Sequence, residues 1–343
     1  MTVLAGQLTA LRLEGDTLWA LDQTRLPFEE VELALRSAED VAAAIRRLAI
    51  RGAPLIGVAA AYGLALELAR DPESLERAYR VLREARPTAV NLAWALDRVY
   101  AAVISHGPSA ALPEALAIED SERAASAAMA LAGADLLSGV RRVLTHCNTG
   151  ALAAPGAGTA LGVVAELARR GGLTGVIATE SRPLLQGARL TVYELARLGI
   201  EHELIVDSAA AGLLAAGAAD AVILGCDRVA ATGDVANKVG TYSLALAAQA
   251  AGIPFVVAGP TSTIDPACAS GADIRIEERS ADEVRMALGQ PLTLGETPCR
   301  NPAFDVTPAA LVTALVTERG VTQPVDGRSI AEVLGLDDKR QLG

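Results

Sequence analysis

Aromatic side chains are scarce in this chain of 343 residues, with three Phe, two Trp and five Tyr, or 3% in total. β-Sandwiches usually need more Tyr, Trp and Thr, so the composition argues against an all-β fold. The hydrophobic residues make up 51% of the chain and are mainly Ala, Leu, Val and Ile, which suits helices packed on a sheet. The length exceeds what one hydrophobic core comfortably supports, and we therefore expect two domains.

Long apolar runs and targeting signals are also missing. No stretch reaches about 18 apolar residues without a charge, so the sequence predicts no transmembrane helix. The N-terminus, MTVLAGQLTALRLEGD, lacks the basic start and apolar core of a signal peptide. The net charge of −11 argues against a general surface for nucleic acid or anionic membrane, although a local basic pocket remains compatible with it. The four cysteines have no CxxC or Cys/His spacing, so we expect no metal site, reduced thiols and a cytoplasmic protein.

The first third of the chain has the pattern of a hairpin followed by helices. Residues 9–22 predict two short strands around Gly15-Asp16, and Pro27 is expected to end that unit. Ser37 then opens an apolar-periodic run in the manner of a capping box. Helical spacing continues to about residue 115, interrupted by Gly, Asp-Pro and Arg-Pro. The sequence thus predicts a smaller, mainly helical N-terminal domain carrying a β-hairpin, over residues 1–115.

After a linking helix near 113–138, short apolar runs alternate with helical ones, which predicts an α/β domain with a parallel sheet over residues 116–343. The expected strands are RVLTHC (142–147), GVIATE (175–180), HELIVD (202–207), AVILGCD (221–227), PFVVAG (254–259) and DIRIEE (273–278). The expected helices between the first five lie near 158–170, 186–198, 208–217 and 240–251.

Polar side chains end four of these strands: Cys147, Glu180, Asp207 and Asp227. Ligands of open α/β sheets bind outside the carboxyl ends of the strands, so we expect these side chains to converge on one crevice. For Asp207, which precedes a helix, we favour a capping or hydrogen-bonding role over direct chemistry. His146 alternates with Cys147 along its strand and is expected to face the other way, as a structural residue.

The glycine-rich loop HCNTGALAAPGAGTALG, after the first of these strands, carries no nucleotide-binding motif. It has no GK[ST], and its glycines are spaced GxGxxxG instead of GxGxxG, so we predict no nucleotide cofactor. Cys147 precedes a turn into a helix, whose N-terminus would favour the thiolate. A buried, inert cysteine is the alternative reading.

Basic residues precede two helix starts. In IRGAPLIG (50–57), Arg51 comes before Gly52 and Ala53, small residues that let a ligand approach backbone amides able to hold an anion. An ordinary helix start is the alternative, and RPTAVNL (86–92), which begins with Arg86, is equally ambiguous. The stretch ESRPLLQGARL (180–190) adds polar side chains at another strand-to-helix transition, namely Glu180, Arg182, Gln186 and Arg189.

The stretch GCDRVAATGDVANKVG (225–240) places Asp227 at the end of an apolar strand. Partial desolvation there would raise the pKa of its carboxyl group and suit it to proton donation. Lys238, just ahead of a helix, would return to the same crevice as a phosphate-binding charge. An ion pair of Asp227 with Arg228 or Lys238 that only ties down the loop is the alternative.

Together these stretches resemble the methylthioribose-1-phosphate isomerases, relatives of the regulatory subunits of eukaryotic translation initiation factor 2B. The match runs nearly end to end, in the family's order, through LDQTRLP (21–27), IRGAPLIGVAAAYG (50–63), RPTAVNL (86–92), THCNTG (145–150), ESRPLLQGARLT (180–191), GCDRVAATGDVANKVGTYSLA (225–245), IEER (276–279) and RNPAFDVTP (300–308). The resemblance implies a Rossmann-like C-terminal domain, a small N-terminal domain and a homodimer.

The resemblance also implies an activity. Members convert 5-methylthioribose 1-phosphate, a cyclic aldose, into the ketose 5-methylthioribulose 1-phosphate in methionine salvage, without metal or redox cofactor. Asp227 matches the acid–base residue and Cys147 its partner. The positions that match phosphate and sugar contacts are Arg51, Gly52, Ala53, Arg86, Gln186, Asn237 and Lys238.

The residue types fit that chemistry. With phosphate on C1 the ring cannot open spontaneously, so an acid such as Asp227 must protonate the ring oxygen as it leaves. Hydrogen must then move from C2 to C1. Cys147 would remove it as a thiolate base, through an enediol-like intermediate. Alternatively, a dry pocket would favour a direct hydride shift, with Cys147 shaping or stabilising that state.

Two departures from the family pattern lie beside the expected crevice, although neither is an assigned residue. Ser181 stands where many members have Thr, and Cys226 where many have Ala. They leave room for a related substrate, 5-deoxyribose 1-phosphate or ribose 1,5-bisphosphate, although the bisphosphate needs a second basic cluster that the sequence does not reveal. A non-catalytic regulatory protein of the same fold is the alternative from another class, and Cys147 with Asp227 favours the enzyme.

Overall fold

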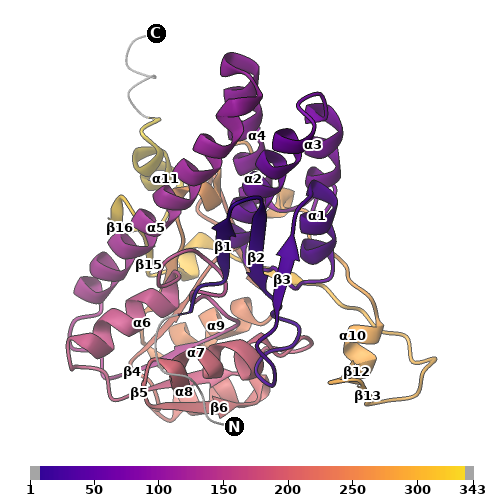
Figure 1. The fold of residues 1–343 in the computed structure, drawn as a ribbon. Coiled ribbons are helices and arrows are strands. Elements are labelled where there is room, and N and C mark those ends of the chain that lie inside the picture. Colours follow the sequence, from indigo (N-terminus) through magenta and orange to yellow (C-terminus); the bar gives the residue numbers. More distant parts are fainter. Residues whose placement is uncertain (1–7, 337–343) are drawn as a thin grey trace.

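The computed structural model describes residues 8–336 of the chain (Figure 1). Residues 1–7, where the sequence predicts no signal-peptide start, lie outside the described range. The N-terminal helices stand over a part that contains the main sheet.

The N-terminal sheet has three antiparallel strands, β1 (Leu11–Glu14), β2 (Thr17–Leu21) and β3 (Glu32–Leu35). The predicted hairpin is confirmed, but the expectation that Pro27 ends the unit is wrong. Pro27 lies in the connection between β2 and β3, where it removes no ladder hydrogen bond, and β3 pairs with β2 beyond it.

Five helices follow: α1 (Ala38–Arg46), α2 (Ala53–Arg70), α3 (Leu75–Arg83), α4 (Val90–His106) and α5 (Ala111–Leu136). Ser37 caps α1 as predicted, because its hydroxyl accepts from the backbone N–H of Asp40 at 3.1 Å. Helix α2 is long and apolar enough by composition to cross a membrane, but 89% of it is buried within this fold. Its apolar surface is therefore covered by its neighbours, chiefly α4 and α5.

The main sheet has seven strands in the order β16-β15-β10-β7-β4-β5-β6, and all neighbours except β15 and β16 are parallel. The five predicted strands that it contains are β4 (Arg142–Thr145), β5 (Gly175–Thr179), β6 (His202–Ile205), β7 (Ala221–Leu224) and β10 (Phe255–Ala258). The expected helices between them are α6 (Ala160–Arg169), α7 (Val192–Arg197), α8 (Ala210–Ala215) and α9 (Thr241–Ala251). The predicted parallel α/β arrangement is confirmed.

Alternate residues of these strands face opposite sides of the sheet. Val143 and Val176 pack in one hydrophobic cluster with α5 and α6, whereas Leu144 and Ile177 pack in another with α8 and α9. Both faces are covered, which explains why the strands are continuous apolar runs without alternation.

The predicted strand at 273–278 is wrong. The segment begins with a short 3-10 turn, and its only pairing in residues 8–336 is an isolated bridge from Glu278 to Pro302. Ile274 and Ile276 supply a strand-like alternation, but they pack in a small separate cluster beside Cys268. The sheet is completed instead by β15 (Ala314–Thr317) and β16 (Gly320–Thr322), near the C-terminal helix α11 (Gly327–Leu334).

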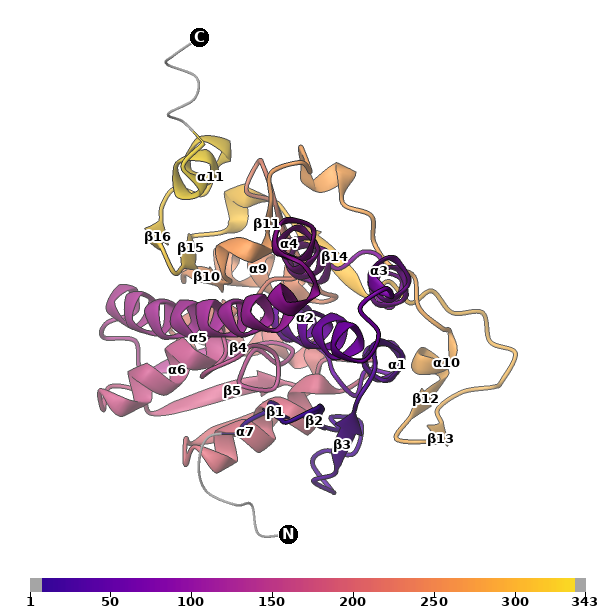
Figure 2. The same cartoon turned by 45° about the horizontal axis from the view of Figure 1, so that its top comes forward.

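A separate four-stranded sheet, which the sequence did not predict, contains β11 (Ile264–Asp265), β8 (Arg228–Ala230), β9 (Val235–Lys238) and β14 (Phe304–Thr307). Asn237 and Lys238 therefore lie on a strand, paired with Asp305 and Phe304 of β14. A short hairpin, β12 (Met286–Ala287) and β13 (Gln290–Pro291), follows α10 (Asp282–Arg285) and stands away from the body in both views (Figure 2).

We propose the division into domains at residues 1–115 and 116–343, a boundary that falls within α5. In its support, one hydrophobic cluster contains the buried core of residues 10–118, and the rest of the described chain adds only Leu152, Leu190 and Tyr193 to it. The two clusters of the main sheet draw their buried residues from position 125 onward.

Candidate active site

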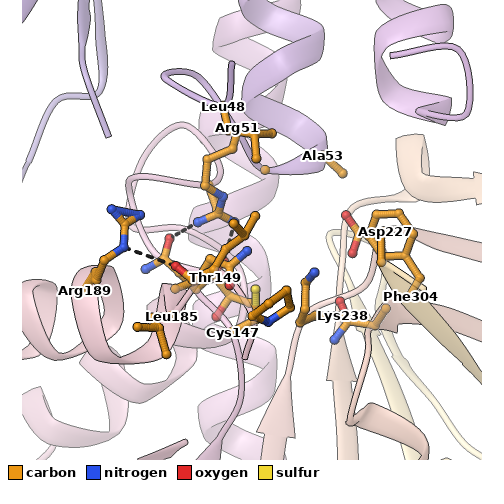
Figure 3. Close-up of a pocket in the computed structure, with 18 of the residues that line it drawn as sticks. Leu48, Arg51, Ala53, Cys147, Thr149, Leu185, Arg189, Asp227, Lys238 and Phe304 are labelled. Carbon is orange, nitrogen blue, oxygen red and sulfur yellow. Dashed lines mark hydrogen bonds between the residues drawn. The ribbon is translucent and has the colours of Figure 1, made fainter. Parts of the chain in front are cut away.

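A cavity of about 430 Å³ lies at the carboxyl ends of β4 and β7, between the loop that enters α2 and the end of β9. All nine residues singled out in the sequence line it: Arg51, Gly52, Ala53, Arg86, Cys147, Gln186, Asp227, Asn237 and Lys238. Figure 3 shows Arg51 reaching toward Cys147 and Thr149, with Asp227 across the pocket beside Phe304. The fold thus brings these residues together, while their individual roles remain predictions.

Two of the four polar side chains that follow strands do not line this cavity. Asp207 accepts from the backbone N–H groups of Ser181 and Arg182, both at 2.7 Å, so it has the hydrogen-bonding role favoured by the sequence. Glu180 is also outside the lining. Buried His146 has ring nitrogens 2.6 Å from the Thr179 hydroxyl and 2.9 Å from the Val239 carbonyl oxygen, as expected of a structural residue.

Asp227 has no ion-pair partner within residues 8–336. Arg228 pairs with Asp265 at 3.4 Å instead, so the alternative of a loop-fixing pair between Asp227 and Arg228 is not formed. Burial raises the pKa of the Asp227 carboxyl group, while Lys238, Arg86 and Arg51 oppose the rise. A carboxyl group in this setting is easier to keep protonated, and its cationic neighbours keep ionisation accessible.

Cys147 adopts a left-handed backbone conformation, with φ of 62°. Its N–H donates to the Ser181 hydroxyl at 2.7 Å, and its carbonyl accepts from the Thr191 hydroxyl at 2.5 Å. Burial raises the pKa of its thiol, against the opposing charges of Arg51 and Lys238. Cys147 therefore lies beside an accessible cavity next to two cations, which distinguishes it from an inert core cysteine.

Arg51 is held by the loop that follows β4. Its two terminal nitrogens donate to the side-chain and backbone oxygens of Asn148, at 2.5 and 2.8 Å. The Asn148 amide donates in turn to buried Glu194 at 2.8 Å. Gly52, with φ of 92°, packs so closely that an added Cβ would lie 2.5 Å from the Ala153 backbone. Only glycine allows the chain at the start of α2 to lie this close to the Ala153 backbone beside the cavity.

Two further cations have incomplete partners. Lys238 is 6% exposed, and burial lowers the pKa of its ammonium group. Its nitrogen lies 5.5 Å from the centre of the Phe304 ring, and the described part of the chain supplies no ion-pair partner. Arg86 pairs with Glu277 at 2.9 Å, but its Nε is buried without a partner. A buried cation without a counter-charge is costly, so an anionic ligand would be favoured here.

Buried polar atoms of the lining also indicate that the cavity binds a ligand. Within residues 8–336, Arg86 Nε, Gln186 Oε1 and Thr149 Oγ1 are buried without hydrogen-bond partners. Such groups are uncommon in folded proteins because each costs free energy until a partner is supplied. A bound molecule with both donors and acceptors, such as a sugar phosphate, would satisfy them.

Sequence reasoning did not single out several residues that build the site. Asn148 and Thr149 belong to the quoted motif THCNTG, so a signal for them was present. Glu194 had none, because a glutamate in an amphipathic helix normally faces solvent. It is buried, at 4% exposure, since the loop after β4 crosses α7 and donates the N–H of Ala151 to it at 2.7 Å.

Known proteins similar to this chain agree on one family. The model of the initiation factor 2 subunit family matches residues 49–324. A methylthioribose-1-phosphate isomerase from Anaeromyxobacter sp. (strain K) is 54% identical over 320 residues, covering 92% of this chain and 94% of the relative.

Two solved structures share the fold at 38% identity. One is 5-methylthioribose 1-phosphate isomerase from Pyrococcus horikoshii OT3, with a TM-score of 0.90 and 97% of each chain covered. The other is translation initiation factor eIF-2B, subunit delta, from A. fulgidus, with a TM-score of 0.84 and coverage of 96% of this chain and 100% of that one.

Proposed function

The chain belongs to the initiation factor 2 subunit family, and we propose that it is a methylthioribose-1-phosphate isomerase. It converts 5-methylthio-α-D-ribose 1-phosphate into 5-methylthio-D-ribulose 1-phosphate, an aldose–ketose isomerisation of methionine salvage. The observation that carries the proposal is one cavity lined by Cys147, Asp227 and Lys238, a cation that forms no ion pair within residues 8–336. Relatives with this name, including one 54% identical over 92% of this chain, support it.

The substrate phosphate binds against the cationic part of the cavity. Lys238 supplies a charge that no carboxylate of the described residues neutralises by an ion pair, and Arg51 and Arg86 add charged donors on the N-terminal side. The amides of Gly52 and Ala53 begin α2, where the helix dipole favours an anion. Gln186 and Asn237, both buried and polar, are placed to contact the sugar.

Asp227 is the acid that opens the ring. Its protonated carboxyl group donates to the ring oxygen as the bond from that oxygen to C1 breaks. Positive charge develops at C1 beside the phosphate ester oxygen. Burial raises the pKa of this carboxyl group, which increases the protonated fraction available for the step.

Hydrogen then moves from C2 to C1 by one of two routes. In the first, a Cys147 thiolate removes the C2 proton, its electron pair forms a C1–C2 double bond, and the proton returns to C1. In the second, hydride passes directly from C2 to C1. In both routes the C2 hydroxyl proton returns to the Asp227 carboxylate, which restores the acid. The raised thiol pKa of Cys147 favours the hydride route, because a neutral thiol is a poor base.

The rest of the lining favours an apolar 5-substituent over a second phosphate. Two other cations of the lining have carboxylate partners, Arg47 with Asp22 at 2.8 Å and Arg279 with Glu283 at 2.5 Å. Arg189 donates to backbone carbonyls, that of Leu184 at 3.2 Å among them. The lining also contains six apolar side chains suited to a methylthio group, namely Leu48, Pro183, Leu184, Leu185, Met286 and Leu288. Comparison of kcat/KM for the methylthio, deoxy and 5-phospho sugars tests this preference.

A regulatory protein without catalysis is the second candidate, and the eIF-2B delta structure at 38% identity favours it. The Cys147–Asp227 pair in one cavity favours the enzyme instead. Purified protein treated with a chelator and given 5-methylthioribose 1-phosphate should form the ketose. Binding without turnover would support the regulatory protein, and turnover only after metal addition would remove the cofactor-free mechanism.

Two further properties complete the proposal. The protein is a cytoplasmic enzyme, as its reduced cysteines suggest, and it acts as a homodimer without nucleic-acid or membrane partners. Light scattering after size-exclusion chromatography measures the assembly, and a mass of about 35 kDa, that of one chain, would contradict the dimer.

A further inference from the structure

Cys147 and Ser181 are two of five non-glycine residues with positive φ in the part of the chain that the structure describes. Cys147 and Ser181 both have φ of 62°, in the left-handed region that side chains other than glycine rarely adopt. Each follows a neighbouring parallel strand, β4 and β5. A conformation of this kind persists only where surrounding contacts hold it, so the contacts of both residues matter.

Contacts with residues other than Cys147 hold Ser181 in place. Its backbone N–H donates to one carboxylate oxygen of Asp207, and the next N–H, from Arg182, donates to the other, each at 2.7 Å. Its hydroxyl lies 3.2 Å from the Thr179 hydroxyl, which approaches His146 Nδ1 at 2.6 Å. The side chain is fully buried, so water does not compete for these contacts.

The fixed Ser181 hydroxyl accepts the backbone N–H of Cys147 at 2.7 Å. This bond and the one from Thr191 to the Cys147 carbonyl clamp both sides of the residue. Rotation of φ back to a negative value would move the N–H off the hydroxyl and turn the side chain to a new direction. The thiol keeps its place next to Arg51 and Lys238 only while the clamp holds.

We propose that Ser181 is a positioning residue, whose hydroxyl, aligned by Asp207, holds the strained backbone of Cys147 so that the thiol lies in the catalytic cavity. The role in turnover rests on the proposed isomerase activity. The placement of the thiol does not, and it is measurable without substrate. Ser181 itself does not line the cavity and is not expected to contact substrate.

Ser181→Ala, with Ser181→Thr as the conservative variant, tests the proposal by steady-state kinetics. We expect Ala to lower kcat by about tenfold or more, with KM changed less than about twofold, because positioning affects the reacting group more than phosphate binding. Thr restores the hydroxyl and should recover most of kcat. Ser74→Ala is the control, since it removes a buried hydroxyl that bonds only to the Asp71 carbonyl, far from the cavity.

A second readout follows Cys147 itself. The pH profile of its alkylation by iodoacetamide, read by mass spectrometry, reports the thiol without any substrate. Loss of the clamp changes both the burial of the thiol and its distance from Arg51 and Lys238, so we expect its apparent pKa to shift by about 0.5 unit or more in Ser181→Ala. Thr should restore the wild-type profile, whereas a purely structural role would leave it unchanged.

Asp207→Asn keeps the proposal testable if Ser181→Ala fails to fold. The amide offers one acceptor to two backbone donors, so Ser181 loses its alignment and both readouts should shift in the same direction. Unchanged kcat and alkylation profiles in folded Ser181→Ala or Asp207→Asn would overturn the proposal. If the wild-type protein fails to isomerise the sugar, the alkylation shift alone still decides the placement of the thiol.

Discussion

Arg51, just before α2, donates from both terminal guanidinium nitrogens to Asn148, which follows β4, at 2.5 and 2.8 Å. This contact links residues 97 positions apart in the sequence and joins the N-terminal helices to the parallel sheet. Glu194 holds Asn148 from behind, so the cation that faces the cavity is supported by two further polar side chains. Substitution of Arg51, Asn148 or Glu194 should therefore weaken phosphate binding.

Replacement of Asp227 by Asn should abolish most turnover. The amide cannot donate an acidic proton to the ring oxygen, and general acid catalysis is typically worth about 10²–10⁴ in rate. Binding of inorganic phosphate, measured by calorimetry, should stay within about threefold, since the cations remain. Asp220→Asn is the control, because Asp220 lies at the opposite end of the same strand and accepts from the backbone of Arg141 and Arg142.

The same variant should be at least as stable as the wild type at pH 7.5. Burial raises the folded-state pKa of Asp227 above its unfolded value of 3.8, so its stabilising contribution is present below that value and is lost as pH rises. Ionisation of the buried carboxyl group as pH rises lowers stability, and Asn cannot ionise. A lower midpoint of thermal unfolding than wild type would mean that Asp227 supports the fold, and lost activity could then not be assigned to chemistry.

The hydrogen that moves should not exchange with solvent. In deuterium oxide, the hydride route transfers the C2 hydrogen intact, and mass spectrometry of the ketose should find little deuterium on C1. The reason is the raised pKa of the Cys147 thiol, which leaves little thiolate to act as a base. Incorporation of one deuterium per turnover would instead assign proton removal from C2 to a base that exchanges with water.

Lys238→Met should weaken substrate binding more than catalysis. A charge-assisted contact to phosphate contributes about 1.5–3 kcal/mol, so KM should rise about 10–100-fold. Stability should not fall, because the substitution removes a buried cation whose pKa is lowered by burial. Arg328→Met, on the exposed face of α11, is the matched control for lost positive charge. An unchanged KM in Lys238→Met would exclude the lysine from the phosphate site.

Glu122 on α5 should make stability depend on pH. Burial raises the pKa of its carboxyl group from 4.5 to about 7, although it accepts from Ser262 at 2.7 Å. The folded protein binds this proton more tightly than the unfolded chain, so stability is full below pH 4.5 and is lost as pH rises through about 7. Relative to wild type, Glu122→Gln should therefore gain about 1–3 kcal/mol in unfolding free energy between pH 5 and 7.5.

Urea unfolding at the two pH values measures this difference. Glu166→Gln is the contrasting control, because hydrogen bonds from Arg169 and Arg170 lower the pKa of half-buried Glu166 to about 2. Its contribution is lost only as pH falls toward that value, so Glu166→Gln and wild type should show the same change between pH 5 and 7.5. If the unfolding free energy of the wild type changes between pH 5 and 7.5 by no more than that of Glu122→Gln, Glu122 does not titrate in this range.

The local pattern of residues determined the larger elements. Apolar periodicity located the N-terminal helices, α5 and five strands of the main sheet, because each buries a face whose spacing is visible over several residues. It failed at 273–278, where two isoleucines imitate a strand but pack in a separate cluster. It also missed β8 and β9, because Arg228, Asn237 and Lys238 interrupt the continuous apolar run that marked the strands of the main sheet.

The candidate site, too, was predicted from the sequence only in part. Polar residues after apolar strands and basic residues before helices indicated a crevice, but the nine positions were chosen only with the resemblance to the isomerase family. Parallel strands explain why residues that follow them meet at one edge of the sheet. The sequence could not show that Lys238 forms no ion pair within residues 8–336, that Glu194 is buried behind Asn148, or that the Ser181 hydroxyl accepts from Cys147. These depend on contacts between residues far apart in the chain, so only the tertiary structure decided which charges are paired and which face the cavity.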